Sequence, residues 1–165
     1  TEEQLDTPIG FDELVKLGSM MRSGGMIVLD EDNCIVDVAR FYMDFIVDES
    51  CGKCSPCRIG TKRMLELLED ICEGRGTMET LDELETLAET IKDTALCGLG
   101  QSAPNPVLST ISQFRDEYIA HIVDKKCPAG VRPGAGQTVS EVTGGRRAYV
   151  SHSGVPGAAD RSHLP

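Results

Sequence analysis

The chain has 165 residues and a formal net charge of −11 at pH 7. This length suits one ordinary domain, or one domain with a tail. The negative charge argues against nucleic acid and anionic membranes as partners, and no apolar run is long enough for insertion into a bilayer. The acidic start does not read as a signal peptide, and seven closely spaced cysteines suit a metal better than disulfides, so we expect a cytoplasmic protein.

Residues 1–31 read as the end of a small α/β domain. Phe11–Gly18 is expected to form a short helix that ends at its glycine. Gly24-Gly25 predicts a turn, and Met26–Leu29 predicts a buried strand. Because one strand makes no sheet, this segment is expected to complete a domain whose remainder is absent.

Residues 32–126 are expected to form an up-and-down four-helix bundle, because four amphipathic stretches are joined by short connections. The predicted helices begin, in chain order, at Asn33, Ser55-Pro56, Thr80 and Asn105-Pro106. Asp32 is the expected N-cap of the first helix, and Thr80 is expected to pair with Glu83 in a capping box. The expected inward face of the first helix consists of Ile35, Val38, Ala39, Tyr42, Phe45 and Ile46.

Three cysteines lie within seven residues, Cys51, Cys54 and Cys57, and Cys97 follows forty residues later. Four soft thiolates that converge on one point are the ligand set of a [4Fe–4S] cluster. Zinc sites usually pair two Cys-x-x-Cys motifs. The spacing therefore favours iron–sulfur, with a structural zinc site as the alternative.

The direction of the chain selects Cys97 as the fourth ligand. Cys72 follows Cys57 along one helix, so it is expected about 22 Å away at about 1.5 Å per residue. Cys34 precedes the triad by a full helix. The third helix returns the chain toward the triad and delivers Cys97, whereas the fourth carries Cys127 to the far end.

Positive charge is expected beside these four thiolates. The N-termini of the second and fourth helices point toward them. Four basic residues are also close: Lys53, Arg58, Lys62 and Arg63. Both effects favour the extra electron of a reduced cluster and raise its potential.

The remaining candidate ligands are assigned simpler roles. Cys34 and Cys72 are expected to be small core residues, and His121 is expected to be a lone, solvated histidine. Cys127 stays open between a surface cysteine and the start of a further cluster module. The sequence shows no Gly-rich nucleotide loop and no Ser/His/Asp arrangement, so no catalytic residue is assigned.

The composition changes near residue 130. Residues 131–165 hold four Arg, one Glu, one Asp, six Gly and three Pro, and no Cys. Such a segment cannot bury enough apolar surface to offset the entropy of ordering. Residues 127–165 are therefore expected to be a disordered or aberrant tail.

The stretch Glu49–Thr61, which contains the cysteine triad, closely resembles a signature of the flavin-bearing, NADH-binding subunit of respiratory complex I. The same family includes NAD(P)-linked and electron-bifurcating [FeFe] hydrogenases and NAD-dependent formate dehydrogenases. Gly24–Val28 and Leu96–Gly100 are similar to that family as well. Cys127, flanked by Lys125-Lys126, favours the hydrogenase branch over the respiratory one.

The resemblance covers about residues 5–130 and implies a fold and a role. Residues 1–31 would end a soluble-ligand-binding β-grasp domain, and the helical bundle would hold one [4Fe–4S] cluster. The ligands that match the family are Cys51, Cys54, Cys57 and Cys97. The cluster would relay electrons from FMN to the next centre in an NAD(P)H-oxidising or NAD(P)-reducing oxidoreductase.

FMN and NAD(P)H would bind to an upstream domain, so the chain alone is not expected to turn over. The implied partners are other subunits of a hydrogenase, formate dehydrogenase or complex I-type assembly, including a small ferredoxin-like or thioredoxin-like subunit. The alternative function is a zinc-stabilised helical interaction module without redox activity.

Overall fold

The computed structural model describes residues 4, 6–19 and 27–131, and it is mainly helical, as expected. The predicted Gly24-Gly25 turn and residues 132–165 of the predicted tail lie outside the described residues. The helices, with η marking a π-helical turn, are α1 (Phe11–Lys16), α2 (Ile35–Glu49), η2 (Pro56–Gly60), α3 (Thr61–Cys72), α4 (Met78–Thr94), α5 (Gly98–Ser102), α6 (Asn105–Ile119) and η3 (Ala120–Asp124).

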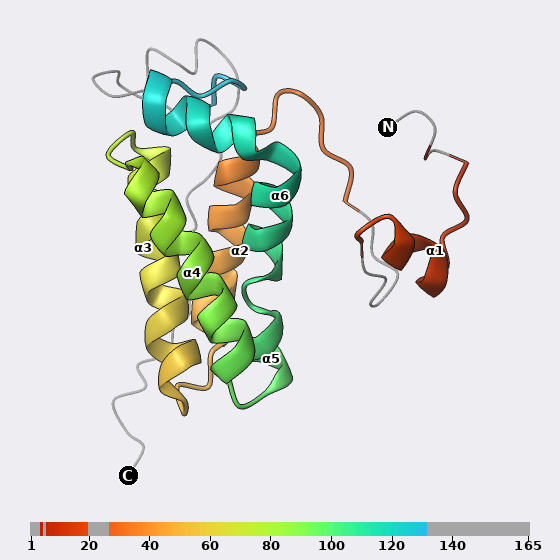
Figure 1. Cartoon of the computed structure of the whole chain (residues 1–165), viewed down its shortest axis with the longest axis vertical. Helices are drawn as coiled ribbons and strands as arrows, with labels where there is room; N and C mark the ends of the chain where they lie inside the picture. The colour runs from red at the N-terminus through yellow and green to blue at the C-terminus, as the bar shows by residue number, and fades with distance from the viewer. Residues whose placement is uncertain (1–3, 5, 20–26, 132–165) are drawn as a thin grey trace, which may run out of the picture.

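The long helices α2, α3, α4 and α6 lie side by side, and α2 and α4 each pack against both α3 and α6 (Figure 1). Successive long helices run in opposite directions. We call the lower end in Figure 1, where α2 and α4 end and α3 and α6 begin, the Cys57 end. The upper end, where α2 begins and η3 follows α6, is the Cys127 end. Among the described residues, no helix has the length and apolar character needed to cross a membrane.

The interior between these helices is built almost entirely from aliphatic side chains. Its largest fully buried members include Met43, Met64, Leu65, Leu68, Ile71, Leu81, Leu84 and Ile91. Tyr118 is the large polar exception, and its hydroxyl forms a 2.8 Å hydrogen bond with Thr110 Oγ1. Within the described part of the chain, every buried side-chain nitrogen and oxygen has a partner.

The inward face of α2 agrees in part with the one its apolar spacing predicts, because Ile35, Ala39 and Ile46 are buried as expected. Val36 and Met43 are fully buried, whereas the predicted core residue Phe45 is 56% exposed. The N-cap is Cys34, whose Sγ accepts from the Asp37 N–H, so the expected Asp32 cap is wrong. Because α2 packs against both α3 and α6, two neighbours decide which of its apolar residues are covered.

Some of the other predicted helix boundaries are confirmed, and others are wrong. The start of the second helix at Pro56 is confirmed, and Gly74 follows its end with φ 72°, a conformation that favours glycine. α4 begins earlier than expected, because Thr77 and Thr80 cap it reciprocally. The predicted pairing of Thr80 with Glu83 is therefore wrong.

The N-terminal segment contains the predicted short helix but not the predicted strand. No residue of α1 is buried, and Figure 1 draws it apart from the long helices. Ile27 and Val28 are 68% and 80% exposed and belong to no strand, so the expected buried strand is wrong for Ile27–Leu29; Met26 lies outside the described residues. A strand needs a partner to satisfy its backbone groups, and the described residues provide none.

Candidate metal centre

The four predicted cluster ligands occupy two connections at the Cys57 end (Figure 1). Cys51, Cys54 and Cys57 lie between the end of α2 and the first turns leading into α3. Cys97 lies between the end of α4 and the start of α5. The antiparallel arrangement therefore carries residues that are forty positions apart in sequence to the same end of the molecule.

The segment that carries Cys97 lies against the cysteine triad at Gly100, in helix α5. A Cβ atom added to Gly100 would lie 3.3 Å from Cys57 Cβ, 3.7 Å from Cys57 Sγ and 2.6 Å from Ala95 Cβ. Only a residue without a side chain fits this gap. Gly100 thus permits the close approach of α5 to Cys57.

Cys54 lies close to Leu96, the residue before Cys97. The backbone N–H of Leu96 favours the thiolate form of Cys54 and lowers the pKa of its thiol. The N–H of Cys57 has the same effect to a smaller extent. Within the triad's own segment, the hydroxyl of Ser50 lies 3.3 Å from Cys57 Sγ. Backbone amides and a hydroxyl are therefore already directed at the sulfurs of the triad, as metal-bound thiolates require.

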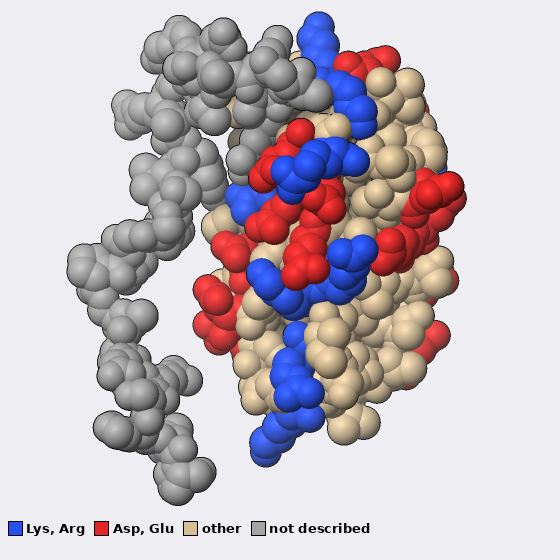
Figure 2. Space-filling model, turned by 90° about the vertical axis from the view of Figure 1, so that its left-hand side faces the viewer, with Lys and Arg blue, Asp and Glu red and all other residues tan. Residues whose placement is uncertain are grey.

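The four predicted basic side chains lie near this end, beside the exposed acidic Asp48 and Glu49 that end α2, and their charges are not all free. Lys53, Arg58 and Lys62 are exposed. Arg63 forms ion pairs with Glu83 at 3.1 Å and with Glu66 at 3.5 Å, so its charge is largely compensated. Figure 2 shows that the lowest charged side chains on this face are basic. Three of the four predicted positive charges thus remain available to a negatively charged centre.

The four predicted ligand thiols do not surround a single point in the described structure. A tetrahedral zinc ion would bring its ligand atoms to about 3.6–3.8 Å of one another, given Zn–S and Zn–N bonds of about 2.3 and 2.0–2.1 Å. No three of these four sulfurs form such a compact group in the described structure.

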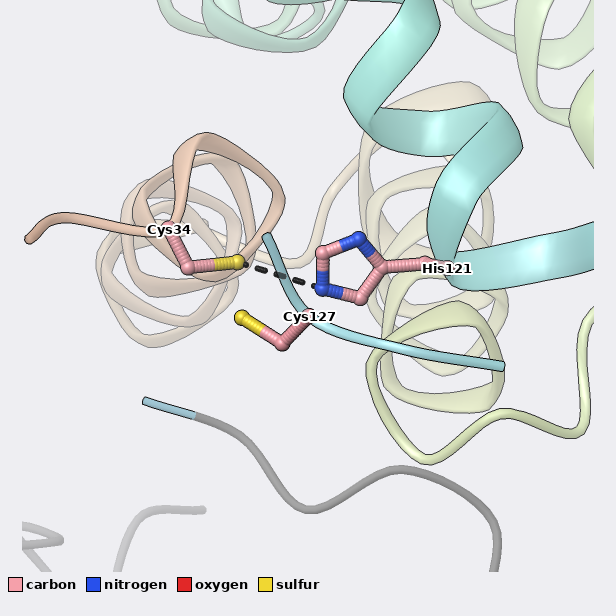
Figure 3. A group of neighbouring side chains, drawn as sticks. All are labelled: Cys34, His121 and Cys127. Carbon is pink, nitrogen blue, oxygen red and sulfur yellow. Dashed lines mark hydrogen bonds between the residues drawn. The ribbon is translucent and has the colours of Figure 1, made fainter. Parts of the chain in front are cut away.

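The described residues do contain one compact group of ligand-type side chains, and it lies at the Cys127 end. Figure 3 shows Cys34, His121 and Cys127 directed toward one another. Their ligand atoms all lie within 4.8 Å of one another, and all three residues are buried. The expectation that His121 is lone and solvated is therefore wrong, and Cys127 is not a surface cysteine.

Sequence reasoning missed this group for a physical reason. His121 and Cys127 are six positions apart and could have been paired from the sequence alone. Cys34 is separated from His121 by 87 positions, and no local pattern indicates that the two meet. Their contact depends on how α2 packs against α6 and η3.

The NADH-ubiquinone oxidoreductase-F iron–sulfur binding region matches residues 37–121 of this chain. The chain belongs to this family. It is 57% identical over 129 residues to the NADP-reducing hydrogenase subunit HndC of Solidesulfovibrio fructosivorans, a match that covers 78% of this chain and 26% of that protein. It is 39% identical over 128 residues to an NADH-quinone oxidoreductase subunit of Streptomyces coelicolor, covering 78% of this chain and 28% of that protein.

The chain is also similar to solved structures. The H2-reduced NAD+-reducing [NiFe]-hydrogenase matches 74% of this chain and 20% of its own chain, with a TM-score of 0.66 and 33% sequence identity. The present chain therefore spans about a quarter of the length of the curated relatives it matches. The family resemblance and the [4Fe–4S] cofactor expected from the sequence are both borne out by the matching family region.

Proposed function

We propose that Cys51, Cys54, Cys57 and Cys97 hold one [4Fe–4S] cluster at the Cys57 end and that this chain serves as an electron relay. The observation that carries the proposal is the double approach of the Cys97 loop to the triad. Leu96 reaches Cys54 and Gly100 reaches Cys57. These contacts support Cys97, rather than another cysteine, as the fourth ligand.

The chemistry of these four cysteines suits a [4Fe–4S] cluster. All four donors are thiols, which are the ligands that iron–sulfur clusters prefer. Amides of Leu96 and Cys57 lower the pKa of the Cys54 thiol and so favour the deprotonated form that binds iron. The bound cluster would supply one-electron transfer, since the redox chemistry belongs to the cofactor.

The protein's own task would be to hold the ligands in place and to set their surroundings. We propose that residues 32–126 act as a four-helix bundle for this purpose, with α2, α3, α4 and α6 as its helices. Lys53, Arg58 and Lys62 are exposed and carry positive charge beside the ligand loops. Such charge favours the reduced state of a bound centre.

The names of the relatives suggest the kind of complex in which this chain works. Their names describe subunits of an NADP-reducing hydrogenase and of NADH-quinone oxidoreductases. We infer that this chain works within an NAD(P)H-linked oxidoreductase complex. Residues 1–31 would belong to a preceding β-grasp domain, and FMN and NAD(P)H would bind upstream of it. Other subunits of the complex would accept the electrons.

The test is a pair of cysteine substitutions in the chain reconstituted anaerobically with iron and sulfide. Cys97→Ala removes a proposed ligand and should reduce bound iron and visible absorption at least tenfold. Cys72→Ala removes a buried thiol from the end of α3 and should leave both close to the wild-type values. Equal iron loss in the two variants would contradict the ligand assignment.

The same preparation separates the relay from the zinc-stabilised alternative. The relay requires about four irons per chain and broad visible absorption at the four-cysteine site. A colourless protein that takes up no iron, and in which Cys97→Ala abolishes zinc binding, would reject the relay in favour of the zinc module.

A further inference from the structure

We propose that the hydroxyl group of Ser50 donates a hydrogen bond to Cys57 Sγ and raises the reduction potential of the cluster that Cys57 would help to hold. This inference rests on the proposed electron relay and concerns how readily the relay accepts an electron. Ser50 follows the last residue of α2, and its Oγ lies 3.3 Å from the Cys57 sulfur in η2. Ser50 is therefore a positioning residue, which acts through a proposed ligand and binds no iron itself.

The direction of this hydrogen bond follows from a second contact of the Ser50 hydroxyl. The backbone N–H of Gly52 donates to Ser50 Oγ at 3.3 Å, so the oxygen already acts as an acceptor while its own hydrogen stays free. The form of cysteine that binds a metal is the thiolate, which carries no hydrogen and can only accept. In the loaded site, the Ser50 hydroxyl is therefore the donor and Cys57 Sγ the acceptor.

Cys57 is the most enclosed of the four proposed ligands, and a donor to its sulfur is correspondingly important. The residue is 4% exposed, whereas Cys51 and Cys97 are exposed and Cys54 is half-buried. Water can form hydrogen bonds with the exposed sulfurs, but it has little access to Cys57. A hydrogen bond is also electrostatically stronger in such surroundings than in water. The loss of the Ser50 hydroxyl would therefore not be made good by solvent.

Both partners of the contact are held by hydrogen bonds of their own backbone. The Ser50 N–H donates to the Val47 carbonyl at 3.3 Å, where α2 ends. The Cys57 carbonyl accepts from the buried Thr61 hydroxyl at 2.6 Å and also from the Thr61 N–H. The hydroxyl and the sulfur thus face each other across the ligand loop without any rearrangement of the helices.

A donor at this sulfur favours the reduced state of a bound cluster. Reduction adds one electron, which the proposed upstream flavin would supply, and the proton stays on Ser50 Oγ. Hydrogen bonds to a charged acceptor are stronger than those to a neutral one, so the hydroxyl stabilises the more negative reduced form to a greater extent. Hydrogen bonds to the sulfurs are among the features that set the potentials of iron–sulfur clusters. Removing the hydroxyl should therefore make the cluster harder to reduce.

The test is a redox titration of the full chain, reconstituted anaerobically with iron and sulfide and followed by EPR of the reduced cluster. Ser50→Ala should keep the wild-type iron content and have a more negative midpoint potential. We expect the equilibrium constant for reduction to fall about tenfold, which corresponds to about 59 mV for a one-electron couple. Ser50→Thr retains a hydroxyl group and should keep the wild-type potential.

Ser55→Ala is the matched control. Ser55 lies in the same ligand loop, is exposed and forms no capping hydrogen bond through its side chain. Its removal should change neither the iron content nor the midpoint potential. A wild-type potential in Ser50→Ala, or an equal shift in Ser55→Ala, would overturn the role of Ser50.

A second pair of variants keeps the test decisive if Ser50→Ala loses its iron. Ser50→Val has the shape of Ser50→Thr but lacks the hydroxyl, so a more negative potential in Ser50→Val supports the proposal and equal potentials overturn it. Iron loss in both Ser50→Ala and Ser50→Val would also overturn it, because the hydroxyl would then build the site rather than set its potential. A wild-type chain that binds no iron contradicts the relay as well, whereas full iron content with unchanged potentials contradicts the role of Ser50 alone.

Discussion

Gly100 lies against Cys57 with room for a hydrogen atom but not for a methyl group. The position of one glycine therefore controls how closely the Cys97 loop can approach the cysteine triad. A substitution there tests the contact that supports the proposed cluster site, without removing any proposed ligand.

We expect Gly100→Ala to destabilise the fold and to weaken cluster retention. The new methyl group would lie 2.6 Å from Ala95 Cβ, and overpacking of this kind costs about 1–3 kcal/mol. Chemical unfolding and the iron content after reconstitution measure the two effects.

Gly98→Ala is the matched control for Gly100→Ala. Gly98 lies in the same short helix, α5, and an added Cβ there meets nothing within 4 Å. Alanine is favoured over glycine in helices by about 1 kcal/mol, so this variant should be neutral or slightly stabilised. Equal iron loss in both variants would show that the Gly100 contact does not matter.

The buried hydrogen bond between Tyr118 and Thr110 predicts a measurable contribution to stability. Tyr118→Phe should lower the free energy of unfolding by about 0.5–1.5 kcal/mol, the usual net value of one such bond. Thr110 Oγ1 keeps a partner in the variant, because it lies 2.8 Å from the Pro106 carbonyl and can donate its hydrogen there. Urea denaturation measures the difference.

Tyr42→Phe provides the comparison, since Tyr42 is only half-buried and its ring packs edge-on against Phe41. Removing its hydroxyl should change the free energy of unfolding by less than about 0.5 kcal/mol. A larger effect at Tyr42 than at Tyr118 would contradict the importance of the buried bond.

The ionisation of Tyr118 is also expected to make the fold less stable in alkali. Burial raises the pKa of its hydroxyl above the ordinary value of 10.0, although the Thr110 hydrogen bond acts in the opposite direction. The unfolded chain then loses this proton at lower pH than the folded chain does. The contribution is fully present below about pH 10 and is lost as the pH rises through the folded-state value.

Thermal unfolding between about pH 8 and pH 11 measures this effect. The wild-type chain should lose stability above about pH 10 more steeply than Tyr118→Phe, which lacks the ionisable group. Parallel pH profiles for the two proteins would show that Tyr118 ionises as readily when folded as when unfolded.

The N-terminal cap of α4 is expected to contribute to the free energy of unfolding. Thr77 Oγ1 accepts from the Thr80 N–H at 3.3 Å, and Thr80 Oγ1 accepts from the Thr77 N–H at 3.1 Å. Thr77→Ala should therefore cost about 1 kcal/mol of stability, within the range of about 0.5–2 kcal/mol for N-caps. Urea denaturation again provides the measurement.

Thr86→Ala is the control for the cap. Thr86 is exposed in the middle of α4, and its hydroxyl donates to the Asp82 carbonyl of the same helix. Alanine is the better helix former there, so this variant should be neutral or slightly more stable. If Thr77→Ala were equally neutral, the start of α4 would not depend on its cap.

The sequence by itself determined the mainly helical class and the grouping of the cysteine triad. Helices are encoded by apolar residues three and four positions apart, and this information is local. The starts near Pro56 and Asn105 and the glycine after α3 were predictable for the same reason. The sequence also predicts Cys97 as the fourth ligand, because antiparallel helices return the chain to the end from which it left.

Only the tertiary structure decided which sides of those helices meet and what lies at the second end. Phe45 was an apolar residue in the right register, yet it is exposed because α3 and α6 cover Val36 and Met43 instead. His121 was unremarkable in sequence, yet packing of distant segments buries it beside Cys34 and Cys127. A contact across 87 positions has no local signature, because it exists only once the helices have packed.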